Sequence, residues 1–157
     1  MVDKKQILRE LEHDFEKLKK EIKLESNFEE LEIAFGIKDS ILSTGFVSED
    51  LSRQLCSKIS ETFYNWINYF NNLILPNSGF MPSSTESQLF SSKEDRELIW
   101  SLIQGSMKFV SKNSLDIISK DKVLQKELID GAMKYWKSEF STKTKEIMKK
   151  VHDGWNK

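Results

Sequence analysis

The chain lacks several features that define common protein classes. Cys56 is the single cysteine, so neither an intrachain disulfide nor a cysteine-based zinc site can form. Two prolines and six glycines are few, which favours long helices over the turn-rich texture of an all-β fold. No run of about 18 apolar residues exists, so we expect no membrane span. Residues 1–5 enter a charged segment without the apolar core of a signal peptide, and we therefore expect a cytoplasmic protein.

The chain also lacks an excess of either charge. Its 24 basic and 25 acidic residues give a net charge of −1, which argues against a protein that mainly holds nucleic acid by its phosphates. Hydrophobic residues make up 38% of the chain, enough for a core under a polar surface. We expect a single domain over residues 1–157.

The most informative stretch is residues 51–75, where aromatic residues are concentrated. Apolar residues recur there at steps of three and four, which predicts one face of a long helix. These residues are Leu51, Leu55, Ile59, Phe63, Trp66, Ile67, Phe70 and Leu73. Asn65, Asn68 and Asn72 fall on the opposite side. The rest of the chain must cover this apolar stripe.

Four further helices are predicted from similar patterns and from capping residues. A first helix begins at Asp3 and extends to about residue 25, and a second begins at Ser26, contains Gly36 and ends at residues 44–45. Another begins at Ser92 and extends to a boundary near residues 119–121, and the last continues to about residue 153. The predicted fold is an all-α bundle of about five helices, two of them long, in one domain.

Residues 76–92 are predicted to form a Ser-rich loop. The loop carries Phe80, Met81, Leu89 and Phe90, which either hold it against the helices or contact a partner. In the central helix, Tyr64 and Tyr69 lie off the centre of the apolar stripe, and tyrosines at partly exposed positions often anchor protein interfaces. The predicted partner-binding residues are Phe80, Met81, Leu89, Phe90, Tyr64 and Tyr69.

A carboxylate-bridged di-metal site is one alternative, because such sites occur in helical bundles and use two Glu-x-x-His motifs. Glu10 and His13 provide one motif. The other histidine, His152, follows Lys149 by three residues, so the second motif is missing. His13 also falls opposite the apolar stripe of its helix, which favours a solvated side chain over a metal ligand.

Other catalytic chemistries find little support. The acidic pairs Glu29/Glu32 and Glu127/Asp130 have spacings suited to Mg²⁺, but both pairs project away from the apolar stripes of their helices. Cys56 has no positioned histidine and lies beside apolar residues, as a small core residue would. No phosphate-binding or dinucleotide motif occurs. We therefore predict no catalytic residue, no metal ligand and no cofactor.

The last helix is rich in lysine, which raises the alternative of weak nucleic-acid binding. Its lysines do not share one narrow face, and acidic residues separate them, so a solvated surface is favoured. Our leading hypothesis is a non-enzymatic helical protein that binds another protein or a second copy of itself. The alternatives are a Mg²⁺-dependent or small-ligand-binding bundle and, after these, nucleic-acid binding through Lys134, Lys137, Lys143, Lys145, Lys149 and Lys150.

Overall fold

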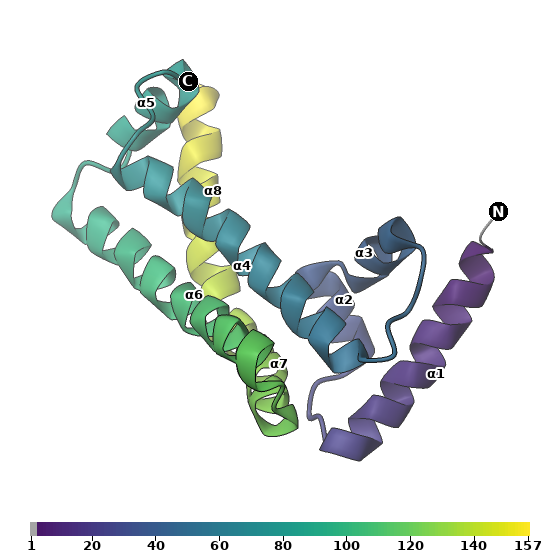
Figure 1. Cartoon of the computed structure of the whole chain (residues 1–157). Coiled ribbons are helices and arrows are strands. Elements are labelled where there is room, and N and C mark those ends of the chain that lie inside the picture. The colour runs from purple at the N-terminus through teal and green to yellow at the C-terminus, as the bar shows by residue number, and fades with distance from the viewer. Residues whose placement is uncertain (1–2) are drawn as a thin grey trace.

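The computed structural model describes residues 3–157 (Figure 1). All regular structure in this range is helical, and no strand occurs in it. The elements are α1 (Lys4–Ile22), α2 (Phe28–Phe35), α3 (Ile37–Thr44), α4 (Leu51–Ile74), α5 (Met81–Gln88), α6 (Lys93–Ser119), α7 (Lys122–Tyr135), the π-helical turn η1 (Trp136–Phe140) and α8 (Ser141–Trp155). The predicted all-α class is confirmed. The predicted count of five helices is wrong, because one predicted helix is divided and an additional helix forms in the predicted loop.

Helix α1 begins as its sequence predicts. The Asp3 carboxylate accepts a hydrogen bond from the Lys5 N–H, which satisfies one of the free donors at the helix start. The helix ends at Ile22, three residues before the predicted end, because Lys23 adopts the left-handed conformation with φ 56°. Its apolar stripe is buried, and consists of Ile7, Leu11, Phe15 and Leu18.

The second predicted helix is two helices, α2 and α3, and Gly36 divides them. Gly36 has φ 62°, a left-handed conformation in which glycine has no steric penalty, and its N–H donates to the Glu32 carbonyl as a C-cap. Asn27 caps α2 in place of the predicted Ser26, because its side chain accepts from the Glu30 N–H. The hydroxyl of Ser26 donates instead to the distant Asp130 carboxylate.

Helix α4 is the central element, and its predicted stripe is buried except that Trp66 is partly exposed. Phe63 lies fully buried near its middle. Its ring has five aromatic neighbours at centroid distances between 5.2 and 6.2 Å, namely Phe35, Phe109, Tyr135, Trp136 and Phe140. These neighbours come from α2, α6, α7 and η1, so the aromatic cluster joins most of the chain.

The predicted loop at residues 76–92 contains helix α5, which corrects the sequence interpretation. Pro82 stands within its first turn, where the missing N–H of proline is tolerated. Serines face the protein interior: the Ser87 hydroxyl donates to the Leu73 carbonyl at 2.7 Å, and the Ser83 hydroxyl accepts from the Asn77 N–H at 3.0 Å. Hydrogen bonds therefore attach α5 to the end of α4.

The C-terminal half begins at the predicted cap, since the Ser92 hydroxyl accepts the Asp95 N–H at 3.1 Å. The predicted boundary near residues 119–121 is confirmed by a left-handed Lys120 and by Asp121, which caps α7. From α7 the chain continues through η1 into α8 without leaving the helix. The single π-helical turn changes the direction in which the following side chains point.

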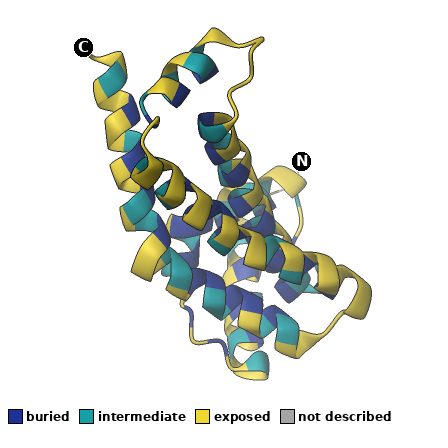
Figure 2. Cartoon of the chain, turned by 90° about the vertical axis from the view of Figure 1, so that its left-hand side faces the viewer, coloured by how far each residue is buried: buried dark blue, intermediate teal, exposed yellow. Residues whose placement is uncertain are grey.

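The helices are arranged around α4. Helix α6 runs beside it in the opposite direction, α7 and α8 lie behind the pair, and α1–α3 surround the first part of α4 (Figure 1). Figure 2 shows buried residues recurring on the sides that the helices turn towards one another. Within residues 3–157 no helix combines the length and apolar character that crossing a membrane requires.

Candidate functional site

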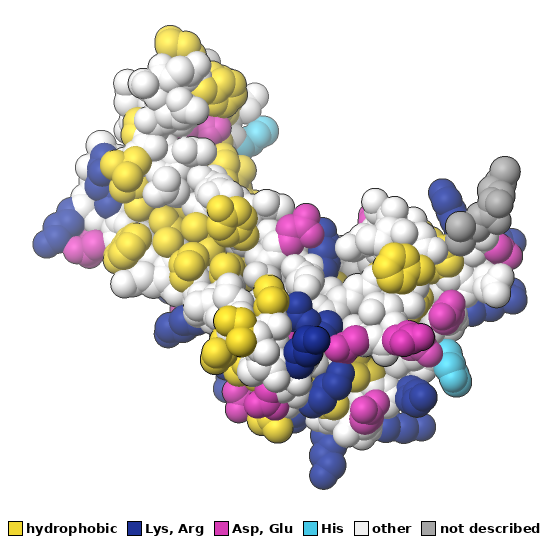
Figure 3. All heavy atoms as spheres, in the orientation of Figure 1, with side chains coloured by type: hydrophobic (Ala, Val, Ile, Leu, Met, Phe, Trp, Pro, Cys, Tyr) yellow, Lys and Arg dark blue, Asp and Glu magenta, His cyan; other side chains and the backbone are white. Residues whose placement is uncertain are grey.

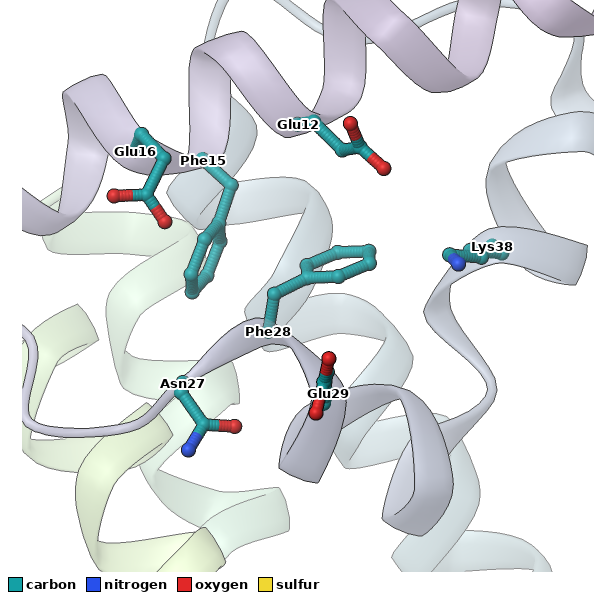
Figure 4. Close-up of a pocket in the computed structure, with 7 residues that line it drawn as sticks. All are labelled: Glu12, Phe15, Glu16, Asn27, Phe28, Glu29 and Lys38. Atoms are coloured by element: carbon teal, nitrogen blue, oxygen red, sulfur yellow. The ribbon is translucent and has the colours of Figure 1, made fainter.

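A hollow of about 540 Å³ lies between α1 and the start of α2 (Figure 4). It is lined by Glu12, Phe15, Glu16, Asn27, Phe28, Glu29 and Lys38. The Phe15 and Phe28 rings meet edge to face with their centroids 5.3 Å apart, and Lys38 Nζ lies 5.7 Å from the Phe28 centroid. The carboxylates would attract a cation, but Lys38 already places one by the aromatic ring. The hollow thus contains an internal cation–π contact between Lys38 and Phe28.

Three of the four side chains in the acidic pairs that were considered for Mg²⁺ have other structural partners. Glu32 accepts the Lys38 N–H at 2.6 Å, Glu127 lies 3.5 Å from the Lys112 ammonium, and Asp130 binds the turn after α1. Both histidines are exposed. In the part of the chain that the structure describes, no three His, Cys, Asp or Glu side chains gather as metal ligands would.

Asp130 connects the N-terminal helices to α7. Its carboxylate accepts the Ser26 hydroxyl at 2.7 Å, the backbone N–H groups of Glu25 and Ser26 at 3.0 to 3.2 Å, and the Lys126 ammonium at 2.8 Å. Burial alone would raise the pKa of this carboxyl group. The hydrogen bonds from Lys126, Ser26 and the backbone outweigh burial and lower the pKa below its ordinary value.

A second buried carboxylate, Asp116, joins α4, α6 and α7. Its fully buried side chain accepts Arg53 Nη1 at 2.5 Å, Gln125 Nε2 at 3.1 Å and the Asp121 N–H at 3.0 Å. Each of these donors satisfies a charge that would otherwise be costly to bury. This network holds the turn between α6 and α7 against the start of α4.

Cys56 is close to the same network and has no exposed surface. Burial, helped by the negative charge of Asp116, raises the pKa of the thiol to about 12. Its Sγ lies 3.8 Å from the Gln125 carbonyl oxygen, to which the thiol donates. A protonated and inaccessible thiol cannot act as a nucleophile, so the structure gives Cys56 a packing role.

The surface of the α4–α6 pair is one site at which large apolar side chains are exposed. We define the α4–α6 face as Tyr64, Ile67 and Ile74 of α4 with Trp100, Ile103 and Met107 of α6. Tyr64 and Trp100 are 52% and 53% exposed, and Met107 is 41% exposed. Figure 3 shows apolar side chains gathered over these two helices. Ile74 and Trp100 also line one shallow apolar hollow, and Trp100 lines another with Ile103 and Met107.

The six side chains that define this face are uncharged, although Lys93, Arg96, Glu97 and Lys108 also line its two hollows. Residues 62–85, which include the second half of α4, contain no Asp, Glu, Lys, Arg or His, although such residues are frequent elsewhere. Residues 98–107 of α6 are also without charge. Depletion of charge together with exposed aromatic side chains is typical of the core of a protein interface. This combination was not predicted from the sequence, although the neutral tracts were a signal that could have revealed it.

The predicted partner-binding residues divide into two groups. Tyr64, Phe80 and Met81 are exposed, with Phe80 and Met81 at the start of α5 and Tyr64 on the α4–α6 face. Leu89 packs against Gly154 of α8, and Phe90 is buried beneath the Lys150 ammonium, 5.0 Å from its ring centroid.

Tyr69 is partly buried, and its hydroxyl donates to Glu86 at 3.0 Å. Burial and then Glu86 raise the pKa of this hydroxyl. Tyr69, like Leu89 and Phe90, therefore contacts other parts of its own chain.

The lysines of the last helical segment are partly neutralised by acidic neighbours. Lys137 pairs with Glu30, Lys143 with Glu139, and Lys150 with Asp95. These contacts join α8 and η1 to α2 and α6, or stay within one helix. Such pairing reduces the positive potential that nucleic-acid binding would need.

Comparison with protein-family models, curated proteins and solved structures found no match to this chain.

Proposed function

We propose that the protein is a non-enzymatic, cytoplasmic helical bundle that binds another protein through the α4–α6 face. The supporting observation is that exposed aromatic and aliphatic side chains coincide with two tracts free of charge. A membrane surface or nucleic acid would select for basic residues at such a face. A neutral apolar face instead suits a partner with a neutral apolar face of its own.

The exposed apolar side chains of this face would contribute favourably to binding, against the entropic cost of association. Covering the exposed half of Trp100 would remove on the order of 100 Å² of mostly apolar area from water, which is about 2.5 kcal/mol at 25 cal/mol per Å². Tyr64 and Met107 would add comparable amounts. Trp and Tyr are the side chains most often found as energetic anchors of interfaces.

Photo-crosslinking in cells that express the chain tests the proposal. We expect p-benzoyl-phenylalanine in place of Gln104, which lies beside Trp100 and Met107, to give a discrete adduct. The same probe in place of the exposed Lys20 of α1 serves as the matched control. The adduct should disappear with Trp100→Glu. If the probe at position 104 gives no adduct, or gives one that persists with Trp100→Glu, the face does not bind a protein.

A further inference from the structure

The neutral tracts of α4 and α6 lie at the same level of the antiparallel pair. Arg53 and Asp116 fix the register through their ion pair. Glu61 follows Arg53 by eight residues along α4, and Lys108 precedes Asp116 by eight residues along α6. Because both helices rise about 1.5 Å per residue, Glu61 and Lys108 share one level. Beyond that level both helices are free of charge, over residues 62–74 of α4 and 98–107 of α6.

Glu61 and Lys108 lie at the outer edges of the pair. At about 100° per residue, Glu61 is turned roughly 60° beyond Tyr64, away from α6. Lys108 is turned about 100° beyond Met107, away from α4. Both residues are exposed. Glu61 has one loose partner, Lys58 at 3.8 Å, and Lys108 makes no ion pair within residues 3–157.

From this arrangement we infer that the occupant of the α4–α6 face is a second copy of the chain, related by a two-fold axis parallel to α4 and α6. The inference rests on the proposed function and specifies its partner. Rotation about such an axis keeps every residue at its level and exchanges the two sides of the pair. Helix α4 of one copy then lies over α6 of the other, so that every neighbouring helix is antiparallel, as in a four-helix bundle.

The charges of the two copies are complementary in this arrangement. Glu61 of each copy meets Lys108 of the other, which gives two equivalent ion pairs at the rim. Arg96 and Glu97 of α6 line the hollow beside Ile74 and Trp100. In the dimer they lie opposite the neutral second half of α4 of the other copy, so like charges do not meet. Because Glu61 and Lys108 share a level on opposite edges of the pair, this two-fold arrangement brings each of them to the oppositely charged residue of the other copy.

The area is adequate for a stable dimer. Residues 57–74 span about 26 Å along α4, and two adjacent helices are roughly 20 Å wide with their side chains. The face thus covers about 520 Å² per copy, or roughly 1,000 Å² in total, at the lower limit of specific interfaces. We therefore expect a dimer that dissociates in the micromolar range.

Sedimentation of the full chain across micromolar to millimolar concentration tests this inference. The expected result is a reversible change from the chain mass of 18.4 kDa to twice that mass. Trp100→Glu should weaken dimerisation by more than tenfold. Lys108→Glu should weaken it about tenfold, because two attractive contacts become repulsive, and Glu61→Lys combined with Lys108→Glu should restore it. Lys20→Glu on α1 is the matched control and should have no effect, and circular dichroism verifies that each variant is folded.

The outcomes separate this inference from the proposed function. If the chain stays monomeric at every concentration but gives a Trp100-dependent adduct at position 104, the dimer inference is wrong. The proposal that the α4–α6 face binds a protein would then still hold. A monomer without that adduct overturns both. A dimer that is insensitive to Trp100→Glu, or that the double charge reversal does not restore, overturns the two-fold arrangement.

Discussion

The ring of Tyr135 on α7 lies directly over the Cα of Gly105 on α6, so a Cβ on Gly105 would overlap the Tyr135 hydroxyl and ring carbons. The Tyr135 ring is itself packed against Phe63, Phe109 and Phe140, with centroids 5.6 to 6.0 Å away. Since these rings restrict its movement, the close approach of α6 and α7 depends on the absence of a side chain at position 105.

Gly105→Ala should destabilise the protein by about 1–2 kcal/mol, measured by urea unfolding. Overpacking against Tyr135 costs about 1–3 kcal/mol, and the better helix propensity of alanine offsets at most about 1 kcal/mol. Ser101→Ala, on the exposed side of α6, is the control and should change stability little. In a Tyr135→Ala background the effect of Gly105→Ala should disappear or change sign. An equal loss of stability from Gly105→Ala with and without the Tyr135 ring would show that the contact with Tyr135 does not cause that loss.

Asp116→Ala should be more damaging, at about 3–5 kcal/mol, because it removes one partner of a buried ion pair. The Arg53 guanidinium, Gln125 and the Asp121 N–H would each lose an acceptor. Lys122→Ala removes the more exposed ion pair with Asp50 and should cost about 1 kcal/mol or less. Similar losses for the two variants in urea unfolding would contradict the structural role of Asp116.

Stability should decrease in acid through Asp130. The pKa of Asp130 is lower in the folded protein than its ordinary value of 3.8. Its contribution to the free energy of unfolding is therefore complete above pH 3.8 and is lost as the pH falls through the pKa of the folded protein. The free energy of unfolding should therefore differ between the native chain and Asp130→Asn by a constant amount from pH 7 to about pH 5. The difference should shrink below pH 3.8. A pH-independent difference would show that the charge of Asp130 is unimportant.

Cys56 should not react with Ellman's reagent at pH 8 while the protein is folded. Its thiol is inaccessible, and its pKa of about 12 leaves almost no thiolate at that pH. In guanidinium chloride the single thiol should react completely and rapidly. Rapid labelling of the folded chain, at a rate independent of added stabilising osmolyte, would show that α4 opens locally around position 56.

The long apolar stripes could be predicted from sequence because burial in this fold follows helical periodicity. The start of α1, the extent of α4, the cap Ser92 and the boundary near residues 119–121 all fit the predictions. Helix α5 could not be predicted in this way. Its inward residues are serines such as Ser87, which bind the α4 backbone through hydrogen bonds, so no apolar period marks the helix.

Two other features required three-dimensional information. In the last helix Ala132, Trp136, Phe140 and Thr144 recur every four residues, so their positions rotate gradually around the helix axis. The π-helical turn η1 accommodates that spacing. The apolar residues of α6 form a broad face in the sequence. In the structure Ile99 and Leu102 are buried while Trp100 and Met107 are left exposed, and only the positions of the other helices could show this.

The Asp130 carboxylate joins residues 105 positions apart in the chain, which bears on the order of folding. A contact between such distant residues closes a long loop and is therefore expected to form after the local α-helical pairs. Helices α1 and α2 would then be the last part to dock and the first to detach. Their amide hydrogens should exchange with solvent deuterium sooner than those of α4, whose neighbours surround it on several sides.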